Sequence, residues 1–132
     1  GDTRMHEIQS EEEFRSLVLE NEKPVLVDFF APWCGPCRIL GPILERVAPD
    51  YPEFLIVKLN TDNLQKIALD LGIRALPTCV IFWAKDIAVT MVGFKSEHEI
   101  RNKLDQVLVQ ISQKSNPDTE PDVEQSTSSG AD

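Results

Sequence analysis

Two cysteines separated by two residues, Cys34 and Cys37, are the side chains in this sequence best suited to chemistry. An apolar run at residues 25–30 precedes them and is typical of a buried strand. Apolar residues at helical spacing follow them over residues 38–48. The pair is therefore predicted at a strand-to-helix turn, where backbone N–H groups and the helix dipole stabilise an anion. We expect the pKa of the Cys34 thiol to lie below the ~8.5 of free cysteine, with both sulfurs within disulfide reach.

A cysteine pair can also be purely structural or form half of a zinc site. Zinc needs about four nitrogen or sulfur ligands, usually from a second paired cluster. Only Cys79, His6 and His98 remain for that purpose, and they are scattered along the sequence. We therefore assign no metal ligand and favour redox chemistry at the pair. Cys79 is interpreted as a small buried hydrophobic residue.

One acidic residue, Asp28, lies inside the apolar run that precedes the cysteines. A buried carboxylate without a partner has a raised pKa and holds a proton at neutral pH. Titratable groups with shifted pKa values gather at functional sites, although structural acids also occur. We favour a functional role for Asp28 over a purely structural one.

The hydrophobic pattern predicts an alternation of helices and strands around this turn. Ser10 and Ser96 are each followed three residues later by a glutamate, which is a helix-start signal. Asp62 is predicted to cap a further helix, and Gly72 to end it. Helices are expected at 10–20, 34–48, 63–70 and from 96 to 111, and strands at 25–30, 54–59, 78–83 and 87–92.

The first two strands and the last two strands should differ in how they pair. The helix at 34–48 connects strand 25–30 to strand 54–59, so these two are expected to be parallel. Strands 78–83 and 87–92 are close enough to form an antiparallel hairpin. Their connection contains Ala84 and Lys85, which resist positive φ. We therefore predict a longer or bulged connection here rather than a type I′ turn.

Length and composition limit the functional class. The chain has 132 residues, of which 42% are hydrophobic, and this suits one globular domain. No apolar run approaches the ~20 residues of a membrane-spanning helix. The net charge of −9 argues against nucleic acid and anionic membranes as partners. Three cysteines are too few for a disulfide scaffold and suit a reducing compartment. No signal peptide is visible, so we expect the cytoplasm, or the plastid stroma if a transit segment has been removed.

The last 21 residues, 112–132, differ in composition from the rest. They hold five acidic side chains, one lysine and a single bulky apolar residue, Val123. Such a segment cannot bury enough surface to offset the entropy of ordering. We expect a domain over residues 1–111 and an acidic, disordered tail over 112–132.

Several motifs occur together in this sequence. W-C-G-P-C at 33–37 follows V-D-F-F-A-P, and K-L-N-T-D at 58–62, G-I-R-A-L-P-T at 72–78 and V-G at 92–93 come after it. In this order and at this spacing the sequence resembles the thioredoxin family over about residues 5–111. The resemblance implies an α/β fold, a three-layer sandwich with a central mixed sheet between helices.

The resemblance also implies dithiol–disulfide exchange in the reducing direction. Cys34 would attack a target disulfide, and Cys37 would resolve the mixed disulfide after giving its proton to Asp28. Pro77 would follow a cis peptide bond that faces the cysteines. Redox tuning would fall to Gly35, Pro36 and Lys58, and target binding to Trp33, Ala75, Leu76, Pro77, Val92 and Gly93.

The implied partners are a thioredoxin reductase, dependent on NADPH or ferredoxin, and proteins that carry disulfides. The sequence has no glycine motif for a nucleotide, so no cofactor is expected, and the chain is expected to act as a monomer. Two alternatives remain. A disulfide oxidase or isomerase usually has a histidine between the cysteines, whereas this chain has Gly35 and Pro36. A redox-inactive binding or chaperone subunit would not need the intact pair, Asp28 and Pro77.

Overall fold

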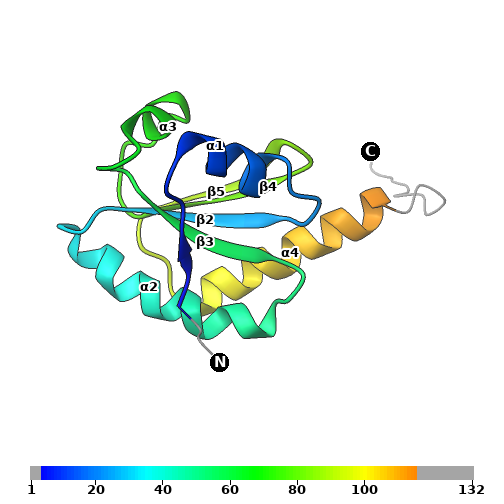
Figure 1. The fold of residues 1–132 in the computed structure, drawn as a ribbon. Coiled ribbons are helices and arrows are strands. Elements are labelled where there is room, and N and C mark those ends of the chain that lie inside the picture. Colours follow the sequence, from blue (N-terminus) through cyan, green and yellow to red (C-terminus); the bar gives the residue numbers. More distant parts are fainter. Residues whose placement is uncertain (1–3, 116–132) are drawn as a thin grey trace, which may run out of the picture. The chain divides into compact units, whose positions relative to one another are not determined.

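The structure is a computed structural model and describes residues 4–115. Its strands form one five-stranded mixed sheet (Figure 1). The strand order is β1-β3-β2-β4-β5. β1, β3 and β2 are parallel, and β4 and β5 continue the sheet in antiparallel fashion. The predicted parallel crossover and the hairpin are therefore confirmed. The strands are β1 (His6–Glu7), β2 (Val25–Phe30), β3 (Leu55–Asn60), β4 (Thr78–Trp83) and β5 (Asp86–Val92).

The helices begin where the sequence provides caps. The Ser10 hydroxyl accepts the Glu13 N–H at 3.0 Å, and the Ser96 hydroxyl accepts the Glu99 N–H at 3.2 Å. The first predicted helix, 10–20, is divided, because its second half is a π-helix. The helical segments are α1 (Glu11–Phe14), η1 (Arg15–Leu19), α2 (Gly35–Val47), η2 (Ala48–Asp50), α3 (Gln65–Asp70) and α4 (Glu97–Ser115).

Helices cover both faces of the sheet (Figure 1). Alternate residues of β2 point to opposite faces, so Val25, Val27 and Phe29 share one face. They pack there with Phe14 of α1 and Ile67 of α3 in one buried apolar cluster. α2 lies over the opposite face, toward which Asp28 points. The fold is thus the predicted three-layer α/β sandwich, and the β2–α2 junction lies at the carboxyl end of the central strand.

The chain divides into two compact units, residues 1–101 and 102–132. The first unit contains the sheet, α1 to α3 and the start of α4. In the second, α4 continues to Ser115, and its Leu104 and Val107 are buried. The helix thus extends four residues beyond the predicted domain end at 111. The rest of the predicted tail, 116–132, lies outside the described residues. None of the helices within residues 4–115 is both long and apolar enough to cross a membrane.

The β4–β5 turn differs from the prediction. β4 ends at Trp83 and β5 begins at Asp86, so only Ala84 and Lys85 connect them, with φ of 57° and 68°. Two central residues at positive φ are the pattern of a type I′ turn, whose twist matches that of the flanking strands. The prediction of a longer or bulged connection was therefore wrong. An irregularity in register lies instead beyond the turn, between the Ile81–Val89 and Phe82–Ile87 pairs.

The start of α3 also differs from the prediction. Leu64 occupies the N-cap position, without a side-chain hydrogen bond, so the prediction that Asp62 caps the helix was wrong. The Asp62 carboxylate instead accepts a hydrogen bond from the Trp33 indole. Gly72 does follow the helix with φ of +72°, as expected for a left-handed stop residue.

Candidate active site

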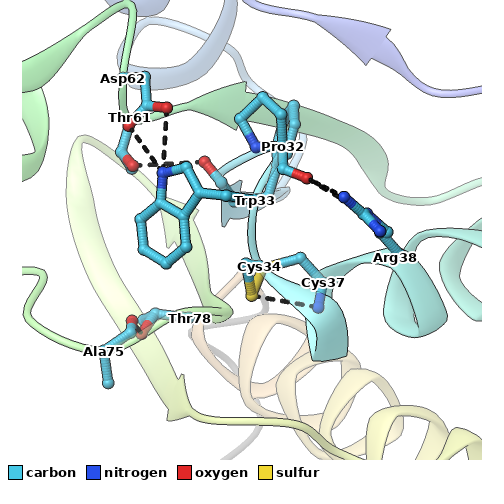
Figure 2. The surroundings of a disulfide bond; sticks show 10 residues. Pro32, Trp33, Cys34, Cys37, Arg38, Thr61, Asp62, Ala75 and Thr78 are labelled. Atoms are coloured by element: carbon cyan, nitrogen blue, oxygen red, sulfur yellow. Dashed lines mark hydrogen bonds between the residues drawn. A yellow bond between two sulfur atoms is a disulfide. The ribbon is translucent and has the colours of Figure 1, made fainter.

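The cysteine pair lies at the start of α2 (Figure 2), joined in the structure by a disulfide bond. Cys34 is the N-cap residue, and Pro36 lies in the first turn, where a missing N–H costs no hydrogen bond. The Cys34 sulfur accepts the Cys37 N–H at 3.2 Å. A thiolate at this position would receive the same N–H bond and the positive end of the helix dipole. Both cysteines are largely buried, with 5% and 6% of their surface exposed.

Asp28 is a buried acid in the middle of the sheet. Only 2% of its surface is exposed, and its Oδ1 has no hydrogen-bond partner within residues 4–115. Burial raises the pKa of the Asp28 carboxyl to about 7, and the positive charge of Lys58 opposes this rise. Lys58 is the neighbour of Asp28 on β3, and Cys79 is its neighbour on β4. The sequence-based expectation of a raised pKa agrees with this environment.

Asp28 and Cys37 line the same cavity, whose volume is about 330 Å³. Lys58, Arg38 and Glu45 also line it, which makes the walls partly polar. A cavity of this size with polar walls has room for water. A proton could therefore pass between the Cys37 thiol and the Asp28 carboxyl through water, without contact between the two side chains.

Cys79 lies beside Asp28 but has different chemistry. It is a buried free thiol in β4. Burial, with the charge of Asp28 as the second cause, raises the pKa of this thiol well above its usual value. A thiol held in the neutral form is a poor nucleophile. This agrees with its interpretation as a small hydrophobic residue. No group of three or more His, Cys, Asp or Glu side chains within residues 4–115 is arranged to hold a metal ion.

Trp33 stands beside the disulfide and is held by Asp62 (Figure 2). Its indole N–H donates to the two carboxylate oxygens of Asp62 at 3.1 and 3.4 Å. Asp62 is in turn fixed, because its own N–H donates to Asn60 Oδ1 at 2.9 Å. The side chain of Trp33 is nevertheless 68% exposed. A large, oriented and exposed aromatic face next to the cysteines is suited to contact with another protein.

The loop before β4 approaches the cysteines through Leu76. Its peptide bond to Pro77 is cis, as predicted, and its side chain packs against the Ala31–Cys34–Cys37 cluster. The Ala75 carbonyl accepts a hydrogen bond from the Thr78 hydroxyl at 2.6 Å, so this carbonyl already has a partner within the loop. Within residues 4–115, the Leu76 N–H and carbonyl have no hydrogen bond to the protein. An extended peptide could pair with these two backbone groups.

The end of β5 completes the surroundings of the pair. The Gly93 N–H donates to the Pro77 carbonyl at 2.8 Å and so joins this strand end to the loop. Gly93 has φ of +86°, a conformation that other residues rarely adopt. Val92 and Phe94, on either side of it, are large apolar residues that remain exposed.

A second cavity, here called the Trp33 pocket, opens on the α3 side of the disulfide. It has a volume of about 420 Å³. Trp33 and Leu76 form the wall nearest the cysteines, and Arg74 is the only charged lining residue within residues 4–115. The described residues that line the pocket are Trp33, Thr61, Gln65, Ala68, Leu69, Ile73, Arg74 and Leu76.

Three parts of this site were not predicted from the sequence. Asp62 as the partner of Trp33 was missed because 29 residues separate the two. Arg38 closes the active-site loop by donating to the Pro32 carbonyl at 3.0 and 3.2 Å (Figure 2). Arg74 was missed as a pocket residue, although it lies within the motif G-I-R-A-L-P-T. That motif was the one signal that could have drawn attention to it.

Residues 5–106 match the thioredoxin family. The chain belongs to the thioredoxin family. It is 43% identical over 96 residues to "Thioredoxin 1" of Synechococcus elongatus, covering 72% of this chain and 90% of that protein. It is 45% identical over 85 residues to "Thioredoxin M-type, chloroplastic" of Chlamydomonas reinhardtii. That match covers 64% of this chain but only 61% of the relative, so the chain matches less than two thirds of that protein.

Solved structures agree with this assignment. The N21Q mutant thioredoxin from Halobacterium salinarum superposes with a TM-score of 0.72 at 29% identity, covering 79% of this chain and 90% of that one. Thioredoxins are oxidoreductases that act by dithiol–disulfide exchange, and this domain carries the close-spaced pair that the exchange needs. It is therefore a disulfide reductase, and its partners are disulfide-bearing targets and a reductase.

Proposed function

We propose that Cys34 is the attacking thiolate of this reductase and that Cys37 is the resolving thiol. The observation that carries this division of roles is the position of each residue. The Cys34 sulfur is at the N-cap of α2, where it accepts a backbone N–H, whereas Cys37 shares a cavity with Asp28. The first position favours a thiolate, and the second favours a thiol with a nearby proton acceptor.

In the first step, the Cys34 thiolate attacks one sulfur of a target disulfide. A bond forms between Cys34 and that sulfur, and the target disulfide breaks. The second target sulfur leaves as a thiolate and takes a proton from water. The product is a mixed disulfide between Cys34 and the target.

In the second step, Cys37 releases the target. Its thiol gives a proton through cavity water to the Asp28 carboxylate, and the resulting thiolate attacks the Cys34 sulfur. The Cys34–Cys37 disulfide forms, and the target sulfur leaves as a thiolate, so two electrons have passed to the target. A carboxyl with a pKa of about 7 is matched to this work near neutral pH. Lys58, Gly35 and Pro36 are proposed to tune this step through charge and helix-start geometry.

Target binding is proposed at the exposed residues around the disulfide. An extended segment of the target would pair with the Leu76 N–H and carbonyl, a short form of strand addition. Its side chains would contact the apolar surface around the disulfide. The exposed residues of that surface are Trp33, Ala75 and Val92, and Leu76 and Gly93 are half-buried. Pro77, proposed with them from the sequence, is itself buried, so we propose that it acts by shaping the loop that carries Leu76.

The oxidised pair must regain two electrons from the reductase, which we propose to use either NADPH or ferredoxin. Supplying the oxidised chain with each purified reductase in turn distinguishes the two. We further propose that the chain acts as a monomer in a reducing compartment, either the plastid stroma or the cytoplasm. Relatives named as chloroplastic, from Chlamydomonas reinhardtii and Arabidopsis thaliana, support the stroma. Imaging of the tagged protein in its own cells tests this.

Serine substitutions at the two cysteines test the mechanism. Cys34→Ser should abolish reduction of a protein disulfide in the presence of excess dithiol, because it removes the nucleophile. Cys37→Ser should form a long-lived mixed disulfide with the target, detected by intact mass and released by dithiol. Cys79→Ser is the matched control and should turn over like the parent. Full activity in both active-site variants, or trapping by Cys34→Ser instead, would contradict the assigned roles.

A further inference from the structure

Among the residues that the structure describes, Arg74 is the one charged side chain that lines the Trp33 pocket. The remaining lining is mainly apolar, with Thr61 and Gln65 as the other polar residues. Arg74 is exposed and makes no ion pair with any residue of the described range 4–115. A guanidinium presents several N–H donors in a planar fork that fits a carboxylate. The pocket therefore offers an unused cation and an apolar wall, and one residue of that wall, Leu76, packs against the two cysteines.

The acidic side chains near Arg74 in the sequence have other partners. Asp62 accepts the Trp33 indole N–H, and Asp70 pairs with Lys66 at 2.8 Å. Arg74 is thus not neutralised by either of them. The chain as a whole carries a net charge of −9, so Arg74 is a positive charge on a protein that is negatively charged overall. Without Arg74, long-range repulsion alone would disfavour acidic targets.

The position of Arg74 relative to the loop suggests what it contacts. It lies two residues before Leu76, whose backbone N–H and carbonyl lie beside the disulfide without partners in residues 4–115. A peptide paired there would send alternate side chains to the same side. One side chain could enter the Trp33 pocket, and a nearby carboxylate on the same peptide could reach the guanidinium.

We propose that Arg74 is a specificity-determining residue that favours targets with a carboxylate close to their reactive cysteine, next to an apolar side chain that enters the Trp33 pocket. This inference rests on the proposed function, because it concerns the targets of the same site. The occupant is a peptide segment of a disulfide-bearing protein. An exposed ion pair of this kind changes a binding equilibrium by a few-fold, and salt weakens it.

Disulfide-linked homodimers of one short peptide test the proposal. Both halves carry the same residues, so attack on either sulfur gives the same chemistry. Each peptide has one cysteine, a leucine next to it, and Glu, Gln or Lys two residues beyond the leucine, so that the leucine and the variable residue point to the same side. Separate series place these residues before and after the cysteine. The measurement is kcat/KM with a dithiol regenerating the enzyme, at low salt and at high salt.

In at least one series, the parent should prefer the Glu peptide over the Lys peptide by about fivefold at low salt, and less at high salt. Arg74→Lys should keep the preference, Arg74→Gln should remove it, and Arg74→Glu should reverse it. Lys66 lies in the same region, but its charge is already paired with Asp70. The Lys66→Gln variant should therefore keep the Glu-to-Lys preference of the parent. The ratio is compared within each variant, which makes it independent of any general loss of activity.

The outcomes separate the two proposals. Equal reduction of the three peptides in both series by the parent, or an unchanged ratio in Arg74→Glu, would overturn the role of Arg74 and leave the reductase function intact. Loss of the ratio in Lys66→Gln as well would overturn it too, because the effect would then be one of overall charge. If the parent reduced none of the peptides and no protein disulfide, the proposed function would fail together with this inference.

Discussion

Replacing Asp28 with asparagine should stabilise the protein at alkaline pH, and the structure gives the size of the effect. Burial raises the pKa of the folded-state carboxyl from 3.8 to about 7. Between these two values the folded state binds more protons than the unfolded state, so stability falls as pH rises. A shift of about three units corresponds to about 4 kcal/mol, fully expressed above pH 7 and largely absent at pH 4.

The amide introduced by Asp28→Asn carries no charge, so the variant lacks this pH-dependent loss. The amide inherits a site where Oδ1 has no partner, which costs about 1–3 kcal/mol at every pH. Asp28→Asn should therefore be less stable than the parent, or equal to it, at pH 4. It should be more stable by about 1–3 kcal/mol at pH 8. The difference in free energy of unfolding between the variant and the parent should change by about 4 kcal/mol from pH 4 to pH 8.

Denaturant unfolding of the oxidised proteins at pH 4, 6 and 8 measures this change in relative stability. Asp70→Asn, which removes an exposed carboxylate, is the control and should follow the pH dependence of the parent. Lys58→Met provides a second test, because the charge of Lys58 lowers the Asp28 pKa. Its loss should raise the Asp28 pKa further and so extend the fall in stability to higher pH. Parallel parent and Asp28→Asn curves, or a less stable variant at pH 8, would show that Asp28 is a satisfied structural carboxylate.

Three further predictions concern the turn, the redox pair and the tail. Combining Ala84→Asn with Lys85→Gly should stabilise the fold by about 1 kcal/mol or more, because both residues have positive φ; an unchanged or lower melting temperature would contradict the turn geometry. The Cys34–Cys37 pair should have the reduction potential general for thioredoxins, about −270 mV, measured against glutathione or a reference dithiol. A value of about −180 mV, as in protein disulfide isomerase, would favour the oxidase or isomerase alternative. We propose that the folded domain needs nothing beyond Ser115, so deletion of residues 116–132 should change the melting temperature by less than about 2 °C in a calorimetric scan.

The sheet could be predicted from sequence because its signals are local and repeated. The apolar run of β2 and the helical spacing of α2 each depend on neighbouring residues, and the crossover between parallel strands follows from them. Asp28 was identifiable for the same reason, since a single acid in an apolar run is visible without any structure. The confirmed caps at Ser10 and Ser96 are equally local.

The predictions that were wrong concern residues with contacts distant in sequence, or residues that the fold holds in an unfavourable backbone conformation. Asp62 has the residue type and position of a helix cap, but the Trp33 indole, far away in sequence, binds its carboxylate. The turn at Ala84 and Lys85 has unfavourable residue types, yet the β4 and β5 pairing on either side holds it at positive φ. A left-handed backbone costs about 1–2 kcal/mol per residue. At both sites tertiary contacts outweighed the local preference, so the prediction from local propensity was wrong.

The location of Asp28 connects these stability arguments to the reaction. A carboxylate on an exposed loop would have a pKa near about 4 and would be a weak acceptor for a thiol proton near neutral pH. The position of Asp28 in a buried strand desolvates the group and raises its pKa to about 7. The same burial makes the ionised form destabilising, and Lys58 limits this by lowering the pKa again. The proposed mechanism thus requires that Asp28→Asn slow the resolving step under the same alkaline conditions in which it stabilises the fold.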